Sequence, residues 1–129
     1  MPFARILTWF QIAMFLVFGV WGFVDPQSLA ALSAIGLPNS LAEGEFRSFY
    51  GGSAMGVAML LLLTVRAGRW QDALWIQIVI YGSIVAGRLT HWASAGALEG
   101  QTAKLLATEA ASLVLAWLLL RKIAVAKTA

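Results

Sequence analysis

Four runs of apolar residues, separated by short polar segments, make up most of the chain. A helix rises ~1.5 Å per residue, so a run of about 20 residues crosses the ~30 Å hydrocarbon core of a bilayer. The pattern therefore predicts four membrane-spanning helices, at about residues 6–24, 46–65, 73–92 and 103–120. Because the connections are short, we expect successive helices to be antiparallel neighbours. The predicted fold is all-α, an integral membrane four-helix bundle that forms a single domain over residues 1–129.

The segment between the first two runs is long enough to carry structure of its own. The first run ends at Asp25 and Pro26, because proline lacks a backbone N–H and restricts the residue before it. Apolar residues then recur at spacings of three, three and two, which is a partly helical pattern: Leu29, Leu32, Ile35 and Leu37. We expect a short interfacial helix or lid between helices one and two.

The first run also resembles a secretory signal peptide, because a basic start precedes it and small residues follow it. Its roughly 19 apolar residues exceed the ~7 to 15 of a signal-peptide core. We therefore expect the first helix to be retained as a membrane span.

Composition supports the membrane interpretation and narrows the function classes. The chain is 60% hydrophobic and 12% charged, with a mean hydropathy of +0.81, which is typical of a polytopic membrane protein. Its Lys and Arg residues are scattered, so the pI near 9.8 indicates no nucleic-acid partner. With no cysteine and one histidine, we expect no metal site, no bis-histidine haem and no other cofactor. The absence of catalytic motifs favours a non-enzymatic protein, although a proton relay through Glu109 and His91 stays open.

Basic residues are distributed unevenly between the two ends of the predicted spans. Arg5, the turn from Arg66 to Arg69 and the basic tail from Arg121 fall on one side. The positive-inside rule then predicts that both termini are cytoplasmic. Tryptophans form an aromatic belt that agrees with this orientation. Four lie near the predicted inner boundary of the membrane, namely Trp9, Trp70, Trp75 and Trp117. Two lie near the outer boundary, namely Trp21 and Trp92.

Polar residues on the second predicted helix follow a helical spacing near its outer end. Glu43, Arg47 and Tyr50 are separated by four and three residues, so an α-helix places them on one face. Gly52 and Gly56 follow as a small-xxx-small pair, which predicts the close approach of a neighbouring helix.

The third and fourth helices place their own ionisable residues in the same outer half of the membrane. Arg88 and His91 share a face at a spacing of three, and Glu109 lies about one and a half turns into the fourth helix. A charge in hydrocarbon costs roughly 2.5 to 3.5 kcal/mol or more, so such residues pair with one another or line a cavity. We expect convergence on an outward-facing polar pocket, with these candidate ligand-binding residues: Arg47, Tyr50, Arg88, Glu109, Glu45 and His91.

Two interpretations of these residues are open: a salt-bridge network that only holds helices together, and a binding site built on that network. Arginine suits both, because its planar guanidinium binds a carboxylate bidentately and keeps its charge when desolvated. Arg47, Arg88 and His91 also lie close enough to the boundary to extend toward lipid head groups. For His91 alone, a position without a role in binding is favoured.

Three segments together resemble a known family. They are the run from Glu45 to Gly52, with the pattern Glu-x-Arg-x-x-Tyr-Gly-Gly, the later run from Ala86 to Leu89, and Glu109 near the start of the last helix. They resemble a family of small four-helix bacterial membrane proteins of unknown function, similar to the DoxX-like group. The resemblance implies a multi-pass protein of the bacterial inner membrane, but no activity. It also implies that the following residues converge: Glu45, Arg47, Tyr50, Arg88 and Glu109.

The leading functional hypothesis is a non-enzymatic membrane protein that binds a small amphipathic ligand or a lipid head group in the outward-facing pocket. Arg47 and Arg88 would meet its anionic group, and Tyr50 and Glu109 would orient it. One alternative is an accessory or structural subunit, whose partner is a larger membrane complex or a second copy of the chain. Another is a small transporter or channel, although the first span lacks the carboxylate that small multidrug exporters use.

Overall fold

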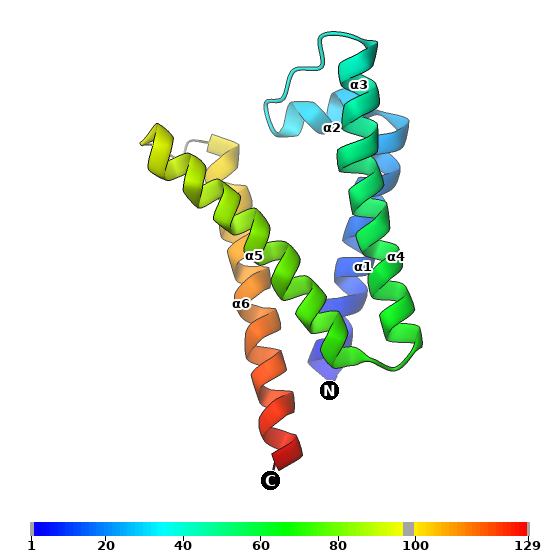
Figure 1. Cartoon of the computed structure of the whole chain (residues 1–129), viewed down its shortest axis with the longest axis vertical. Helices are drawn as coiled ribbons and strands as arrows, with labels where there is room; N and C mark the ends of the chain where they lie inside the picture. The colour runs from blue at the N-terminus through cyan, green and yellow to red at the C-terminus, as the bar shows by residue number, and fades with distance from the viewer. Residues whose placement is uncertain (1, 97–99, 129) are drawn as a thin grey trace. The chain divides into compact units, whose positions relative to one another are not determined.

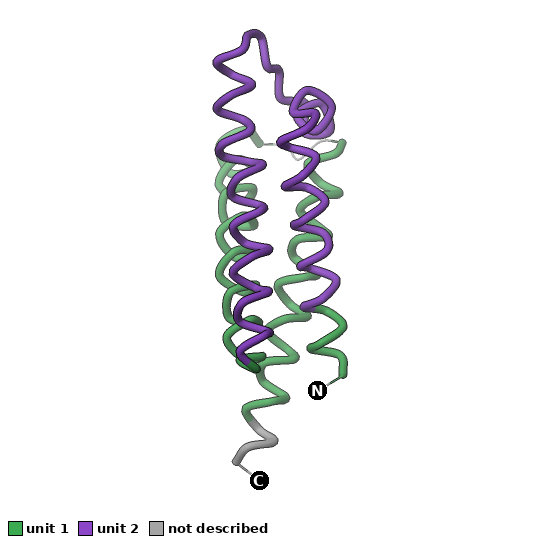
Figure 2. The backbone as a smooth tube through the Cα atoms, turned by 90° about the vertical axis from the view of Figure 1, so that its right-hand side faces the viewer, with its two compact units in different colours: residues 1–7, 68–129 green, residues 8–67 purple. Residues whose placement is uncertain are grey.

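The structure, a computed structural model, describes residues 2–96 and 100–128, with side chains up to residue 124, and its regular elements are all helical (Figure 1). The helices in chain order are α1 (Pro2–Val24), α2 (Pro26–Leu32), α3 (Ser40–Phe46), the π-helical turn η1 (Arg47–Gly52), α4 (Ser53–Arg66), α5 (Trp70–Ala95) and α6 (Gly100–Thr128). The chain divides into two compact units, residues 1–7 with 68–129 and residues 8–67 (Figure 2).

Four helical segments are long and apolar enough to cross a membrane, as the sequence predicts. They are Pro2–Val24, Ser40–Arg66, Trp70–Ala95 and Gly100–Ala124, and the second runs without a break through α3, η1 and α4. This second segment begins about six residues before its predicted start, because the Asn39 side chain accepts a hydrogen bond from the Ala42 N–H and caps α3.

In the unit that contains α5 and α6, these two helices lie side by side as a helical hairpin (Figures 1 and 2). Gly96 ends α5 in the left-handed conformation that glycine favours, with φ of 76°. The hairpin core is a cluster of buried apolar residues to which the first turns of α1 also contribute: Ala4, Leu7, Leu74, Ala116, Leu120 and Ile123.

Residues 8–67 bring α1 against the long second segment at the level of η1. Backbones approach so closely there that a Cβ on Gly22 would lie 2.8 Å from the Gly51 Cα, and one on Gly19 would lie 2.9 Å from the Met55 nitrogen. The predicted approach of the third helix to Gly52 and Gly56 would join the two units and stays a prediction. Within this unit Gly51 makes the close contact, whereas a Cβ on Gly56 would meet nothing within 4 Å.

The predicted short helix after Pro26 is present as α2. Asp25 caps it, and the indole N–H of Trp21 donates to the Ser28 hydroxyl at 2.6 Å. Apolar residues of α2, of the connection and of α3 then pack into a cluster with the end of α1: Leu29, Ala30 and Phe46, with Phe18, Trp21, Ile35 and Leu37.

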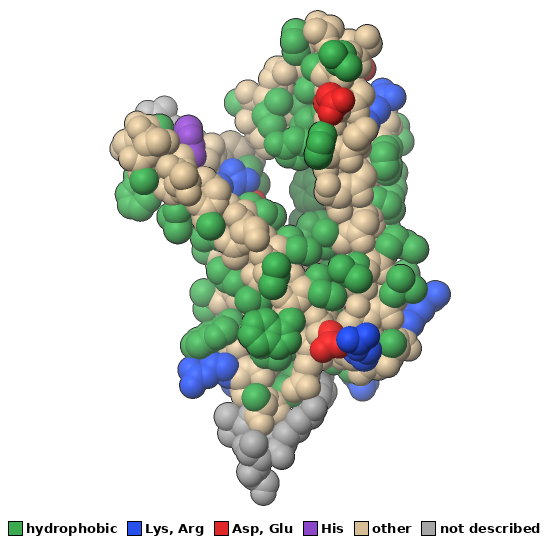
Figure 3. Space-filling model, in the orientation of Figure 1, with side chains coloured by type: hydrophobic (Ala, Val, Ile, Leu, Met, Phe, Trp, Pro, Cys, Tyr) green, Lys and Arg blue, Asp and Glu red, His purple; other side chains and the backbone are tan. Residues whose placement is uncertain are grey.

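Large apolar side chains also cover much of the outer surface of the helices (Figure 3). Val79 on α5 is 62% exposed and Leu63 on α4 is 59% exposed. A soluble protein rarely exposes such extensive apolar surface, whereas helices that face lipid tails require it.

The contact between Gly22 and Gly51 gives a prediction for stability. Gly22→Ala places a methyl group against backbone atoms that cannot move aside alone, so we expect the free energy of unfolding to fall by about 1–3 kcal/mol. Gly56→Ala is the matched control, and it should be neutral or gain up to ~1 kcal/mol from helix propensity. Denaturation midpoints in mild detergent measure both, and equal effects would contradict the close contact.

The cap of α2 gives a prediction for pH dependence. Hydrogen bonds from the Ser28 side chain and backbone lower the pKa of Asp25 below its ordinary value of 3.8. A lowered folded-state pKa adds stability that is present above the unfolded pKa and is lost as the pH falls through the folded value. We therefore expect the temperature of the thermal unfolding midpoint to decrease once the pH is lowered below about 4. Asp25→Asn keeps an acceptor for the cap and should weaken this dependence. Identical pH profiles would rule out a contribution from Asp25.

Candidate functional site

The π-helical turn η1 coincides with the signature segment of the second spanning helix. It covers Arg47–Gly52, and α-helix continues on both sides of it. Such turns carry an extra residue and occur frequently at functional sites. Helical spacing in the sequence predicts a regular α-helix here and does not predict the turn. The adjacent Gly51 and Gly52 were the available signal, because two glycines weaken an α-helical backbone.

Arg47 begins the turn and faces Glu43 across one turn of helix. Its Nη2 lies 3.9 Å from the Glu43 carboxylate, and the two side chains are 46% and 33% exposed. Glu43 also accepts a 2.7 Å hydrogen bond from the Gln27 amide, which donates to the Leu37 carbonyl as well. Glu43 is therefore fixed mainly by Gln27, and the Arg47 guanidinium holds only a long, exposed ion pair.

Tyr50 lies further along the turn, with its ring stacked on Phe46. The ring centroids are 4.3 Å apart and the planes differ by 12°. Phe46 is 5% exposed and belongs to the cluster beneath α2, whereas Tyr50 is 54% exposed. Phe46, which the sequence analysis did not single out, thus sets the position of the half-exposed Tyr50 ring. Glu45 is exposed, and it is Glu43 that faces Arg47.

In the helical hairpin, the structure brings Arg88 of α5 and Glu109 of α6 together. Arg88 Nε and Nη2 donate to the two carboxylate oxygens of Glu109 at 2.5 Å and 2.8 Å, a bidentate arrangement. The side chains are 24% and 14% exposed, so both charges are largely removed from solvent. His91 lies near the end of α5 and is exposed. The convergence of Arg47 with Arg88 and Glu109 would join the two units and stays a prediction.

Comparison with known protein families finds a match over most of the chain. Residues 3–120 match the family described as "Domain of unknown function (DUF4345)". The chain belongs to this family. No curated protein and no solved structure matches it. The DUF4345 match confirms the predicted kinship with a family of unknown function, while the relation to the DoxX-like group stays a prediction.

The DUF4345 match runs from near the start of α1 to Leu120 of α6. It therefore includes residues of all four apolar helical segments, the η1 turn and the pair of Arg88 and Glu109. The family description assigns no activity to these two clusters.

The largely buried pair of Arg88 and Glu109 should respond to substitution differently from an ion pair on the surface. Arg88→Leu or Glu109→Leu alone leaves one largely buried charge without its partner, so we expect a loss of roughly 3 kcal/mol in the free energy of unfolding. The double variant should recover most of that loss, because apolar replacement of both partners removes the desolvation cost.

The exposed pair of Arg69 and Asp72 on α5 is the control for this experiment. Its single variants should each cost less than ~1 kcal/mol, as exposed ion pairs do. A double-mutant cycle measured by denaturation in detergent tests both pairs. If the losses at Arg88 and Glu109 simply add, the two charges are not coupled.

Proposed function

We propose that this chain is a multi-pass protein of the bacterial inner membrane, a four-helix bundle with both termini in the cytoplasm. In this proposal it carries out no reaction and binds the anionic group of a small amphipathic molecule or lipid at the outer end of its second helix. Four helices of sufficient length and apolarity support the membrane location. The cytoplasmic termini rest on the bias of Lys and Arg toward one end of the predicted spans.

The observation that carries the proposal is the half-exposed Arg47 on a π-helical turn within an apolar spanning segment. A guanidinium near hydrocarbon requires an anionic partner, and the Glu43 carboxylate is 3.9 Å away and engaged by Gln27. A carboxylate, sulfate or phosphate on a ligand would offer Arg47 the bidentate contact that Glu43 does not. Tyr50 adds an exposed ring and a hydroxyl that can donate or accept.

A neighbouring aromatic ring favours an amphipathic ligand over a simple anion. Tyr50 lies three residues from Arg47, about one helical turn away, and is 54% exposed. A ligand with an apolar portion would cover such surface while its head group meets Arg47, so both parts would contribute to affinity.

Arg88 and Glu109 take the structural role in this proposal. Both oxygens of Glu109 already accept hydrogen bonds from Arg88, so a ligand anion would have to displace a bidentate carboxylate. The pair joins α5 to α6, and we assign ligand binding to Arg47 and Tyr50. Glu45 and His91 are exposed and play no necessary part.

The test compares two single-charge changes on the same continuous helix. Full-length protein is extracted in mild detergent, and co-purifying anionic amphiphiles are measured by mass spectrometry in wild type, Arg47→Gln and Arg66→Gln. Arg66 is an exposed arginine at the end of α4 and serves as the control. We expect Arg47→Gln to lower retention about tenfold or more, because a hydrogen bond to a charged group contributes about 1.5–3 kcal/mol. Arg66→Gln should retain the wild-type amount.

Two outcomes count against the proposal. One is an Arg47→Gln protein with unchanged circular dichroism that keeps every co-purifying molecule. The other is an equal loss in both variants, which would indicate a general effect of surface charge.

A further inference from the structure

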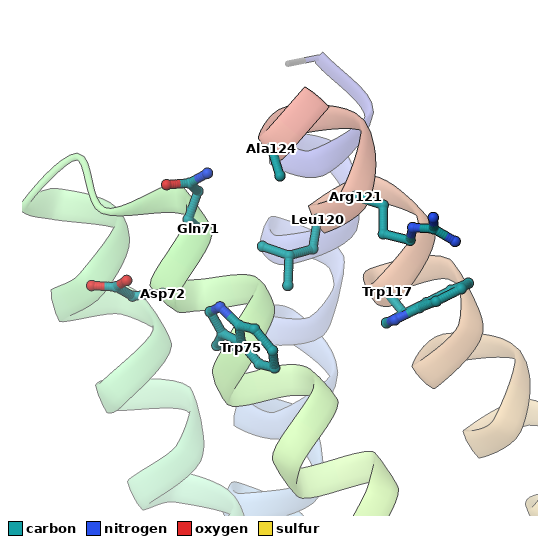
Figure 4. A pocket seen from close by; sticks show the side chains of 7 residues that line it. All are labelled: Gln71, Asp72, Trp75, Trp117, Leu120, Arg121 and Ala124. Carbon is teal, nitrogen blue, oxygen red and sulfur yellow. The ribbon is translucent and has the colours of Figure 1, made fainter. Parts of the chain in front are cut away.

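A second polar feature lies at the opposite end of the helical hairpin from Arg88 and Glu109. A groove of about 430 Å³ opens between the first turns of α5 and the last turns of α6. Trp75 and Leu120 point into the space between the two helices, and Arg121 lies beside Trp117 on α6 (Figure 4). Gln71 contributes a polar group at the end of the groove. The groove thus combines an apolar floor with a cation at its margin.

Arg121 is available to an external anion. Its guanidinium carbon lies 4.8 Å from the centroid of the Trp117 ring, which orients the side chain without neutralising it. Among the described residues, no carboxylate forms an ion pair with Arg121. Asp72, the acidic residue that lines the groove, is already paired with Arg69 at 2.5 Å.

The surrounding charge also favours an anionic occupant. Arg5, which lies over the Trp70 ring at 5.2 Å, adds a cation to the same end of the hairpin unit. Among the residues whose side chains the structure describes, this end of the unit also carries the cations of Arg69, Arg121 and Lys122, against the carboxylate of Asp72. Basic clusters at the ends of membrane-spanning helices attract anionic lipid head groups, and indole rings favour the head-group level.

We propose that this groove binds a phospholipid with an anionic head group, with its phosphate at Arg121 and its glycerol region against Trp75 and Trp117. Exposed apolar side chains lie one turn beyond each indole, where acyl chains would pack. Val79 lies one turn from Trp75 on α5, Val114 lies one turn from Trp117 on α6, and both are more than half exposed. A soluble phosphate would use Arg121 but would leave this apolar surface uncovered.

The test measures lipid binding by full-length protein in a neutral detergent, using native mass spectrometry. Phosphatidylglycerol is titrated in parallel with phosphatidylcholine of the same acyl chains. The key comparison is Arg121→Gln against Lys122→Gln, because the two residues are adjacent and equally charged but only Arg121 lines the groove. We expect Arg121→Gln to weaken phosphatidylglycerol binding about tenfold or more. Lys122→Gln should weaken phosphatidylglycerol binding less than about threefold, because the attraction between Lys122 and the head group acts across solvent and is screened by salt.

Two further arms define the site. Arg121→Lys keeps the charge and should recover most of the binding that Arg121→Gln loses. Glycerol phosphate, which lacks acyl chains, should not displace phosphatidylglycerol at equal concentration.

Three results would overturn the inference: equal losses in the two glutamine variants, equal binding of the two lipids by wild type, or full competition by glycerol phosphate. In the Arg47→Gln background, Arg121→Gln should still weaken phosphatidylglycerol binding and Lys122→Gln should not, so failure at the groove can be distinguished from failure at the proposed ligand site.

Discussion

The constraint on which this structure depends is the cost of leaving a polar group without a partner beside apolar surroundings. Backbone groups meet this constraint by forming helix throughout the four spanning segments. Side-chain hydroxyls meet it locally, because each donates to the carbonyl four residues earlier: Thr64, Ser83, Thr90 and Ser112. The Gln77 amide does the same to the Ala73 carbonyl. The ionic groups need partners from further along the chain, so the way each charge is paired distinguishes the parts of the molecule.

Arg88 and Arg47 satisfy this requirement in different ways. Arg88 meets Glu109 bidentately across two helices, and the pair is largely buried. Arg47 has only the distant Glu43 on its own helix and is half exposed. A charged side chain that is paired within the chain links two helices energetically, but it has little remaining capacity to bind an external ligand. An incompletely neutralised guanidinium retains its capacity to bind, which is why the proposed ligand site is placed at Arg47.

The sequence predicted the spanning helices well, because apolar runs of this length have few structural alternatives. It did not predict the early start at Ser40, which depends on the Asn39 cap, or the π-helical turn at Arg47–Gly52. That turn meets α1 where Gly51 lies against Gly22, and a contact between segments far apart in the chain leaves no periodic signal. The position of Tyr50 was missed for a different reason: its ring stacks on Phe46, which lies four residues earlier on the same helix and was not singled out as a candidate. Helical spacing alone had placed Tyr50 in a stripe with Glu43 and Arg47.

The two ends of the α5 and α6 hairpin show how one sequence feature can serve two purposes. At one end Arg88 is paired with Glu109. At the other end, among the described side chains, the cations around Arg121 outnumber the carboxylate of Asp72. During insertion, an excess of Lys and Arg keeps a loop or terminus on the cytoplasmic side. In the proposed orientation the same charges lie at the membrane surface after insertion, where anionic head groups are available as partners. The groove with its two indoles differs from a simple topology signal, because it gives those charges a shaped apolar surface on which one lipid can be held. The selectivity of Arg121 over Lys122 therefore decides whether this end of the hairpin binds a lipid specifically or only attracts the membrane surface.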